Sequence, residues 1–185
     1  MDIKSDIIFG TPLYSIKLHE PDVNSYLENF VKNLETNDSE SYPYCANGYT
    51  TFGKGNVLEF EDLSAFKNII MDITHQIHSS LNLQGSLYMS NSWLTINRKH
   101  SFHNTHNHVP SCWSGVYYAK AKPEDATIEF VNNDLAITSW PYTRVEEYNI
   151  LNSPAYTEAV ETGKLLIFPS YLPHNVNEHT NDNER

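Results

Sequence analysis

The chain has 185 residues, and its 23 acidic side chains outnumber 12 basic ones, so the formal net charge is −11 with nine histidines neutral. Hydrophobic residues make up 39% of the chain and aromatic residues 12%, which is enough to fill a core and excludes a disordered polypeptide. An acidic surface without a run of Lys or Arg repels phosphate groups, so charge argues against nucleic-acid binding and against anionic membranes.

The length fits one domain over residues 1–185. The longest C-terminal aliphatic run, residues 165–168, is far shorter than the roughly 20 residues that cross a bilayer. The first residues lack the basic and long apolar segments of an export signal. Cys45 and Cys112 are too few for a disulfide framework or a thiolate zinc site, so we expect reduced cysteines and a cytoplasmic protein.

The first half of the chain predicts helices with connecting segments. Residues 6–18 predict a strand, and a helix should begin at Pro21 and end near Asn37, because apolar residues recur there at spacings of three and four. Residues 41–55 are rich in Gly, Pro and aromatic residues and predict a loop. A second helix is predicted for residues 62–81, with an apolar stripe that should cover a sheet.

Two histidines of this second helix, His75 and His78, lie off the apolar stripe. A histidine pair at this spacing can hold a metal, but no carboxylate or cysteine completes the set nearby. We therefore expect both on a solvated helix face.

The second half of the chain predicts mostly sheet. Short β-prone runs occupy residues 87–89, 93–96, 116–118, 127–131 and 164–168. The long stretch between residues 132 and 162 predicts either a lid over a site or a surface helix near residues 155–160. The fold class is therefore mainly β with flanking helices, a sandwich or jelly roll with helical support over about 20–82 and a β core over about 86–185.

Four of the nine histidines fall between positions 100 and 108. In an extended strand His106 and His108 project from the same face, whereas His103 has the opposite parity. His174 follows an apolar run and a turn bounded by prolines, where a late strand could present it. Together His106, His108 and His174 predict a three-imidazole metal site with open positions. The alternative is a polar patch, with His174 capping a turn.

The remaining histidines of this half, and one near the N-terminus, are expected to be solvated or to support the site from outside. They are His19, His100, His103 and His179.

Several motifs stand out together, namely residues 8–14, 92–97, 106–108, 113–118 and 163–170, with His174 and Arg185. In this order and spacing they resemble a family of iron(II)/2-oxoglutarate dioxygenases found in marine bacteria and their phages. The similarity extends over nearly the whole chain. It implies a double-stranded β-helix that holds the metal inside, with Fe(II) as cofactor and 2-oxoglutarate and O2 as co-substrates.

The resemblance also implies metal ligands. In prolyl-hydroxylase-like relatives one histidine stands two residues before an acidic ligand, and a second histidine comes on a late strand. These positions correspond to His106 and His174, but the acidic position is His108 here, a departure from the usual triad of two histidines and one carboxylate. If a carboxylate replaces one histidine, Glu129 or Asp134 is the first candidate.

Binding of 2-oxoglutarate needs an anchor for its distal carboxylate, and a guanidinium suits a buried carboxylate well. Arg185, eleven residues after His174, has the spacing of this arginine in relatives. Tyr118 matches a tyrosine that donates to the same carboxylate, and Asn97 matches a polar residue lining the pocket. The alternatives are a charged chain end, a core aromatic and a strand-end turn. Relatives continue through another strand after this arginine, so either the chain is naturally short, in which case Arg185 would be poorly held, or the given sequence stops early.

The sequence therefore predicts an oxygenase that hydroxylates an unidentified small-molecule or peptide substrate and converts 2-oxoglutarate to succinate and CO2. One alternative is a cupin-like metalloprotein that does not use 2-oxoglutarate, although the glutamate expected after the His-x-His pair is missing. Another is a non-enzymatic jelly-roll binding protein, which leaves the clustered histidines unexplained.

Overall fold

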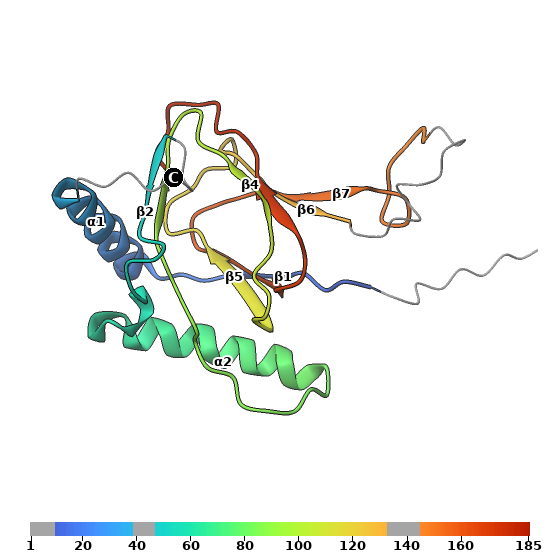
Figure 1. Cartoon of the computed structure of the whole chain (residues 1–185), viewed down its shortest axis with the longest axis horizontal. Helices are drawn as coiled ribbons and strands as arrows, with labels where there is room; N and C mark the ends of the chain where they lie inside the picture. The colour runs from blue at the N-terminus through green and yellow to red at the C-terminus, as the bar shows by residue number, and fades with distance from the viewer. Residues whose placement is uncertain (1–9, 39–46, 133–144) are drawn as a thin grey trace, which may run out of the picture.

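The computed structural model describes residues 10–38, 47–132 and 145–185 (Figure 1). The helices are α1 (Pro21–Asn37) and α2 (Ser64–Ser80), and two 3-10 turns, η1 (Val57–Glu59) and η2 (Glu61–Leu63), precede α2. The strands are β1 (Tyr14–Lys17), β2 (Gly48–Thr50), β3 (Thr95–Asn97), β4 (His103–His106), β5 (Trp113–Tyr117), β6 (Ile128–Val131), β7 (Ala155–Glu158), β8 (Lys164–Pro169) and β9 (His174–Val176). In these three ranges we find no helix with the length and apolar character that a membrane span requires.

The strands form antiparallel sheets that account for the predicted fold class, mainly β with flanking helices. One sheet has the order β1-β8-β5, a second has the order β4-β9-β6-β7, and β2 pairs with β3. The consecutive strands β8 and β9 belong to different sheets, so the turn between them carries the chain from one sheet to the other. That turn brings His174 to the start of β9.

The core lies on both sides of β8. Leu166 and Phe168 face β6, where the rings of Phe130 and Phe168 pack edge to face with centroids 4.9 Å apart. Leu165 and Ile167 face the other way and pack against α2. A strand that is buried on both faces has a continuous run of apolar residues, and this run is what predicted a strand at residues 164–168. Figure 1 shows α2 running along the outside of the sheet that contains β1 and β5.

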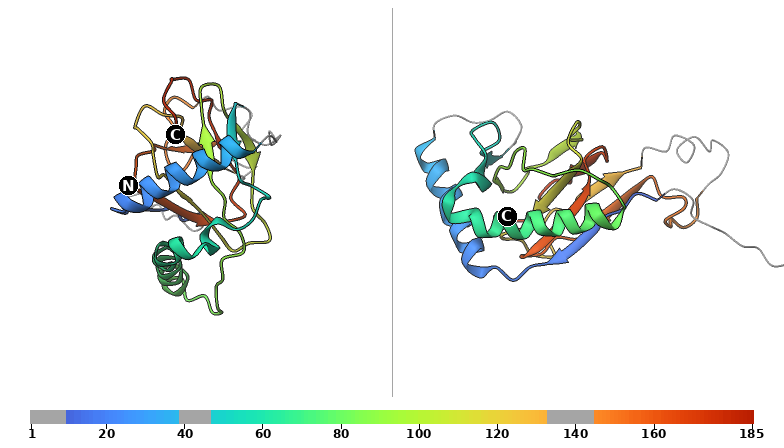
Figure 2. Two further views of the ribbon diagram at one scale, coloured as in Figure 1. Left: turned by 90° about the vertical axis from the view of Figure 1, so that its left-hand side faces the viewer. Right: turned by 90° about the horizontal axis from the view of Figure 1, so that it is seen from below.

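The predicted helices are confirmed within two residues of their ends. Helix α1 begins at Pro21, whose fixed φ and missing N–H suit the first turn. Its Leu27 and Val31 are buried, Leu27 against Leu63 of η2 and Val31 against the sheet of β2 and β3. Figure 2 shows that the helices run in different directions, since α2 is seen end-on where α1 lies across the view.

The solvated position predicted for His78 is wrong. This side chain is buried, and its Nδ1 accepts a hydrogen bond from Nε1 of Trp113 at 3.2 Å. The apolar stripe of α2 predicts which side faces the sheet, but it does not reveal that an indole N–H on β5 needs an acceptor. His75 is half-buried, and its Nδ1 donates to the carbonyl of Met71.

Two predictions in the second half are also corrected. The helix near residues 155–160 is wrong, because Ala155–Glu158 forms β7 and pairs with β6. Residues 87–89 lie outside any strand. Residues 1–9, 39–46 and 133–144 are outside the described residues, so the lid interpretation stays a prediction, and Cys45, Asp134 and the start of the predicted loop lie there.

Gly163 provides a test of this fold, because it precedes β8 with φ of +83° and its carbonyl accepts from Leu18 N. A Cβ at this position would collide with the Leu18 carbonyl oxygen, whereas at Gly85, also at positive φ, it would meet open space. We expect Gly163→Ala to lower the free energy of unfolding by about 3 kcal/mol, and the control Gly85→Ala by about 1 kcal/mol. Urea denaturation of both variants measures this, and equal losses would contradict the close approach of β8 and Leu18.

Candidate metal centre

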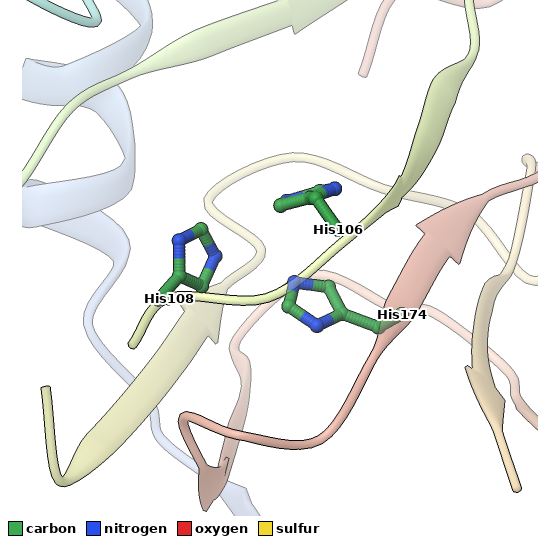
Figure 3. A group of neighbouring side chains, drawn as sticks. All are labelled: His106, His108 and His174. Carbon is green, nitrogen blue, oxygen red and sulfur yellow. The ribbon is translucent and has the colours of Figure 1, made fainter. Parts of the chain in front are cut away.

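Three histidines converge at one point of the molecule. Two of them are two residues apart in the sequence, and the third comes much later in the chain. His106 ends β4, His108 follows two residues later, and His174 begins β9 (Figure 3). One ring nitrogen from each lies within 4.8 Å of the others. The ring centroids are 4.4 Å apart for His106 and His174, 4.9 Å for His106 and His108, and 5.1 Å for His108 and His174. This spacing is suitable for three ligands of one metal ion.

Backbone pairing positions the three rings. His106 and His174 are direct partners in the antiparallel pair of β4 and β9. His108 lies beyond the end of β4, and its backbone N–H donates to Ser170 O at 2.9 Å. Ser170 is fully buried, and its hydroxyl lies 2.7 Å from that of Ser114 on β5. The predicted convergence of His106 and His108 is therefore found, although only His106 belongs to the strand.

Hydrogen bonds select the tautomer of two of these rings. Nδ1 of His106 donates to Asn104 O at 2.7 Å, and Nδ1 of His174 donates to Leu172 O at 3.0 Å. Because a carbonyl can only accept, the proton lies on Nδ1 and Nε2 keeps its lone pair. Proteins commonly orient a metal-binding histidine by a hydrogen bond from the ring nitrogen that does not bind the metal.

Burial favours the neutral form of two of the three rings, His108 and His174. His174 is 3% exposed, and burial lowers its pKa to about 4, with the neighbouring histidines adding to the effect. Burial and His106 also lower the pKa of His108. Neutral imidazole is the form that binds a metal.

A carboxylate from Glu129 is not available to this centre. Glu129 pairs with Asn175 in the register of β6 and β9, and its Oε1 accepts from Nδ2 of Asn175 at 3.0 Å. The adjacent Phe130 is the residue that faces His174, so Glu129 points to the opposite face of the sheet. Among the described residues, the group that could hold a metal consists of histidines alone.

A second group of predicted residues, Asn97, Tyr118 and Arg185, also comes together. The backbones of Asn97 and Arg185 exchange two hydrogen bonds, at 2.7 and 3.0 Å. The Arg185 guanidinium donates to Ala126 O and lies 5.5 Å from the centroid of the Tyr118 ring. Arg185 is thus firmly attached to the sheet, and the expectation that it would be poorly held is wrong.

The residues before Arg185 reinforce this attachment. Arg98 binds Glu35 of α1 through two nitrogens and Glu184 through Nε. His179 is fully buried, donates to Asn183 O at 2.7 Å and accepts from Ala126 N. Of the two positions expected for His179, solvated or supporting the site from outside, the structure fits the second, because this buried ring joins residues 177–185 to the start of β6.

The surroundings of Arg185 fit a bound carboxylate. Within residues 10–38, 47–132 and 145–185, no carboxylate forms an ion pair with its guanidinium, and the nearby Tyr118 is 6% exposed. The charge of Asp125 acts on Arg185, but its carboxylate is already bound by Lys122 N, Asn181 and Asn183. Burial raises the pKa of Tyr118 to about 12, so its hydroxyl remains a donor.

The alternation of side chains along a strand did not predict one further residue near the site, His103. His103 and His106 are three residues apart and should face opposite sides, but a bulge lies between them, since they pair with Val176 and His174, which are two apart. His103 therefore faces the same side as His106, and its Nε2 donates to Oδ1 of Asn97 at 3.0 Å. Burial, assisted by Arg185, lowers its pKa to about 4. By contrast, His19 and His100 are exposed, as expected.

An aromatic pair borders the metal-ligand candidates. The Trp93 ring lies 5.6 Å from His108 between centroids, and Phe52 packs edge-on against Trp93 at 5.0 Å. Trp93 is 37% exposed, and His106 is exposed as well. The three-imidazole group is therefore accessible from solvent on the side of Trp93.

A β fold with three convergent imidazoles and a separate, half-buried guanidinium defines a class of protein, one suited to a metal ion and an acidic ligand. Comparison with known proteins gives the family. Residues 91–185, more than half of the chain, match the model of the family described as "Putative 2OG-Fe(II) oxygenase". The chain belongs to this family of 2-oxoglutarate-dependent oxygenases, whose cofactor is Fe(II) and whose co-substrates are 2-oxoglutarate and O2.

Solved structures show the same fold, a double-stranded β-helix. A prolyl-4-hydroxylase from Pseudomonas putida has a TM-score of 0.63 at 13% identity, over 95% of this chain and 88% of the other. HygX from Streptomyces hygroscopicus, solved with nickel and 2-oxoglutarate, has a TM-score of 0.58 at 12% identity, over 95% and 80%. HygX with hygromycin B also bound gives 0.59 at 12% identity, over the same shares. A search of curated protein sequences found no match.

The lowered pKa values predict how the metal-free protein responds to acid. Unfolded imidazoles, with a pKa near 6.5, bind protons that the folded His103 and His174 do not accept until about pH 4. Stability should therefore be full above about pH 6.5 and fall as the pH drops towards 4, with His174 contributing on the order of 2 kcal/mol. Urea unfolding at several pH values measures this. The variant His174→Gln should show a smaller loss, and an identical pH dependence would contradict the buried, neutral His174.

Proposed function

We propose that His106, His108 and His174 hold the catalytic Fe(II), and that the protein hydroxylates a C–H bond of a small molecule or peptide. The observation that carries this proposal is the convergence of three imidazoles, two of which have Nδ1 bonded to a carbonyl and Nε2 available. Three protein ligands leave open positions, which an oxygenase needs for its co-substrates.

The guanidinium of Arg185 and the hydroxyl of Tyr118 bind the distal carboxylate of 2-oxoglutarate in this proposal. Tyr118 is buried and Arg185 is half-buried, and a guanidinium partly removed from water, without an ion pair in the described chain, is stabilised when an anion joins it. The carbonyl of Ala126 and the Tyr118 ring keep the guanidinium in place. Asn97 holds the Arg185 backbone and so maintains this arrangement.

Bound Fe(II) supplies the activation of O2 that couples conversion of 2-oxoglutarate to succinate and CO2 with hydroxylation of the substrate. The chain contributes orientation and a partly water-free interior. The substrate would approach beside Trp93, since that half-exposed ring borders His108. The aromatic wall suits a peptide, an amino acid or a small metabolite.

Three neutral imidazoles would have an electrostatic consequence. They leave the 2+ charge of the metal uncompensated, whereas a carboxylate ligand would remove one unit. The carboxylate of 2-oxoglutarate next to its keto group would remove one of these two charges, because the distal carboxylate is paired with Arg185, so its attraction to the metal is stronger with His108 than with an acidic residue. This accounts for a functional site in which histidine stands at the usual acidic position.

We further propose that residues 1–185 act as one oxygenase domain. No observation favours the cupin-like or non-enzymatic alternatives over membership of the oxygenase family. The cytoplasmic setting and the bacterial or phage origin stay predictions.

Succinate formation tests the proposed function. With Fe(II), 2-oxoglutarate and O2, the wild-type protein should form succinate slowly even without substrate and should bind one Fe(II) per chain. His174→Ala removes the buried ligand and should abolish both metal binding and succinate formation. The control His75→Ala alters a histidine of α2 outside the site and should preserve both. A folded, metal-loaded wild-type protein that neither binds nor converts 2-oxoglutarate would refute the proposal.

Arg185 should affect the co-substrate without affecting the metal. We expect Arg185→Ala to weaken 2-oxoglutarate binding about a hundredfold, because a buried charge-assisted contact is lost, and to leave the Fe(II) dissociation constant unchanged. Calorimetry without O2 measures both constants. Lys99→Ala, which removes an exposed cation paired with Asp182, should change neither. Equal weakening of metal and co-substrate binding by Arg185→Ala would contradict its assignment.

A further inference from the structure

The strand β4 carries a histidine that neither the metal triad nor the carboxylate anchor includes. His103 occupies the other end of β4 from His106, and its ring turns inward only because of the bulge between the two residues. A β-bulge redirects side chains at a cost in ladder hydrogen bonds, and such bulges are common beside active sites. The side to which His103 turns is the side of the metal-ligand candidates.

The contacts of His103 place it between the two parts of the site. In the pair of β4 and β9, its partner Val176 is two residues from His174, so His103 is the next inward side chain along the ladder from the triad. Its Nε2 donates to Asn97 Oδ1 at 3.0 Å, and the Asn97 backbone is bonded to that of Arg185. The charges of both His106 and Arg185 act on the His103 ring.

Asn97 thereby links His103 to Arg185. Its backbone is hydrogen-bonded to that of Arg185, the proposed anchor of one end of the co-substrate, and its side chain accepts from the His103 imidazole. The His103 ring is half-buried and is held by the hydrogen bond from its Nε2 to Asn97. Its position relative to Arg185 is therefore determined by the sheet.

We propose that His103 is a specificity-determining residue for the co-substrate: its imidazole, held by Asn97, lines the space between the metal triad and Arg185 and selects the chain length of the 2-oxo acid. This inference rests on the proposed function. 2-Oxoglutarate has two methylene groups between its keto carbon and its distal carboxylate, and a rigid side wall favours that length over the homologue with one more methylene, 2-oxoadipate.

The experiment measures dissociation constants of 2-oxoglutarate and 2-oxoadipate for the Fe(II)-loaded protein without O2, and the Fe(II) dissociation constant separately. His103→Leu, which keeps volume but loses the donor, should weaken 2-oxoglutarate binding about tenfold. His103→Ala, which opens space, should shift the preference towards 2-oxoadipate by about tenfold or more. Neither variant should change Fe(II) affinity more than about twofold, because His103 is not a ligand in this proposal.

Two further variants keep the test decisive. His103→Asn is shorter than histidine but retains a donor, so it should show the same shift towards 2-oxoadipate even if the alanine variant fails to fold. His75→Leu makes the leucine substitution at a half-buried histidine of α2 and should leave every constant unchanged. A purely structural His103 would alter the melting temperature without changing the ratio of the two 2-oxo acids.

The outcomes separate this inference from the proposed function. If the wild-type protein binds Fe(II) and 2-oxoglutarate, and folded His103 variants retain the wild-type preference between the two acids, the inference is overturned and the proposed function stands. If the wild-type protein binds neither Fe(II) nor 2-oxoglutarate, both are overturned. A shift of the ratio in His103→Ala or His103→Asn, with metal affinity retained, supports the inference.

Discussion

The pairing of β4 with β9 is the constraint on which the site depends. It sets His106 opposite His174 although 67 residues separate them along the chain, and it does so through backbone hydrogen bonds that need no metal. The core on both faces of β8 then fixes the turn that leads into β9, and Ser170 in that turn holds the backbone of His108. The three imidazoles are therefore preorganised by the fold, and the carbonyl partners of two rings direct their free nitrogens to a common point.

A second constraint acts at Arg185, where residues 177–185 return to the sheet. Ion pairs of Glu184, the buried ring of His179 and the backbone exchange with Asn97 together fix Arg185. These contacts come from α1, β3 and the start of β6, so parts of the fold distant in sequence cooperate in holding one guanidinium. In the proposed function, the distal carboxylate of 2-oxoglutarate supplies the counter-ion that this half-buried guanidinium lacks among the described residues.

The sequence was informative where a local pattern carries the physics. Apolar spacing predicted α1 and α2, the continuous apolar run predicted β8, and the i, i+2 rule predicted the approach of His106 to His108. Tertiary partners decided the rest. Ala155–Glu158 is a strand because β6 pairs with it, His78 is buried because Trp113 needs an acceptor, and His103 faces inward because of a bulge that alternation alone does not reveal. The burial of His78 and the inward direction of His103 depend on partners that are distant in sequence. The sequence alone does not show which residues those partners are.

The central proposal is that three imidazoles, and none of the carboxylates among the described residues, bind the iron. A crystal grown without O2 in the presence of Fe(II) and 2-oxoglutarate tests this directly, because anomalous scattering from iron locates the ion independently of the protein atoms. The account predicts one iron bound by nitrogens of His106, His108 and His174, with the distal carboxylate of 2-oxoglutarate at Arg185. Iron bound elsewhere, or bound by a protein carboxylate in place of one of these rings, would contradict it.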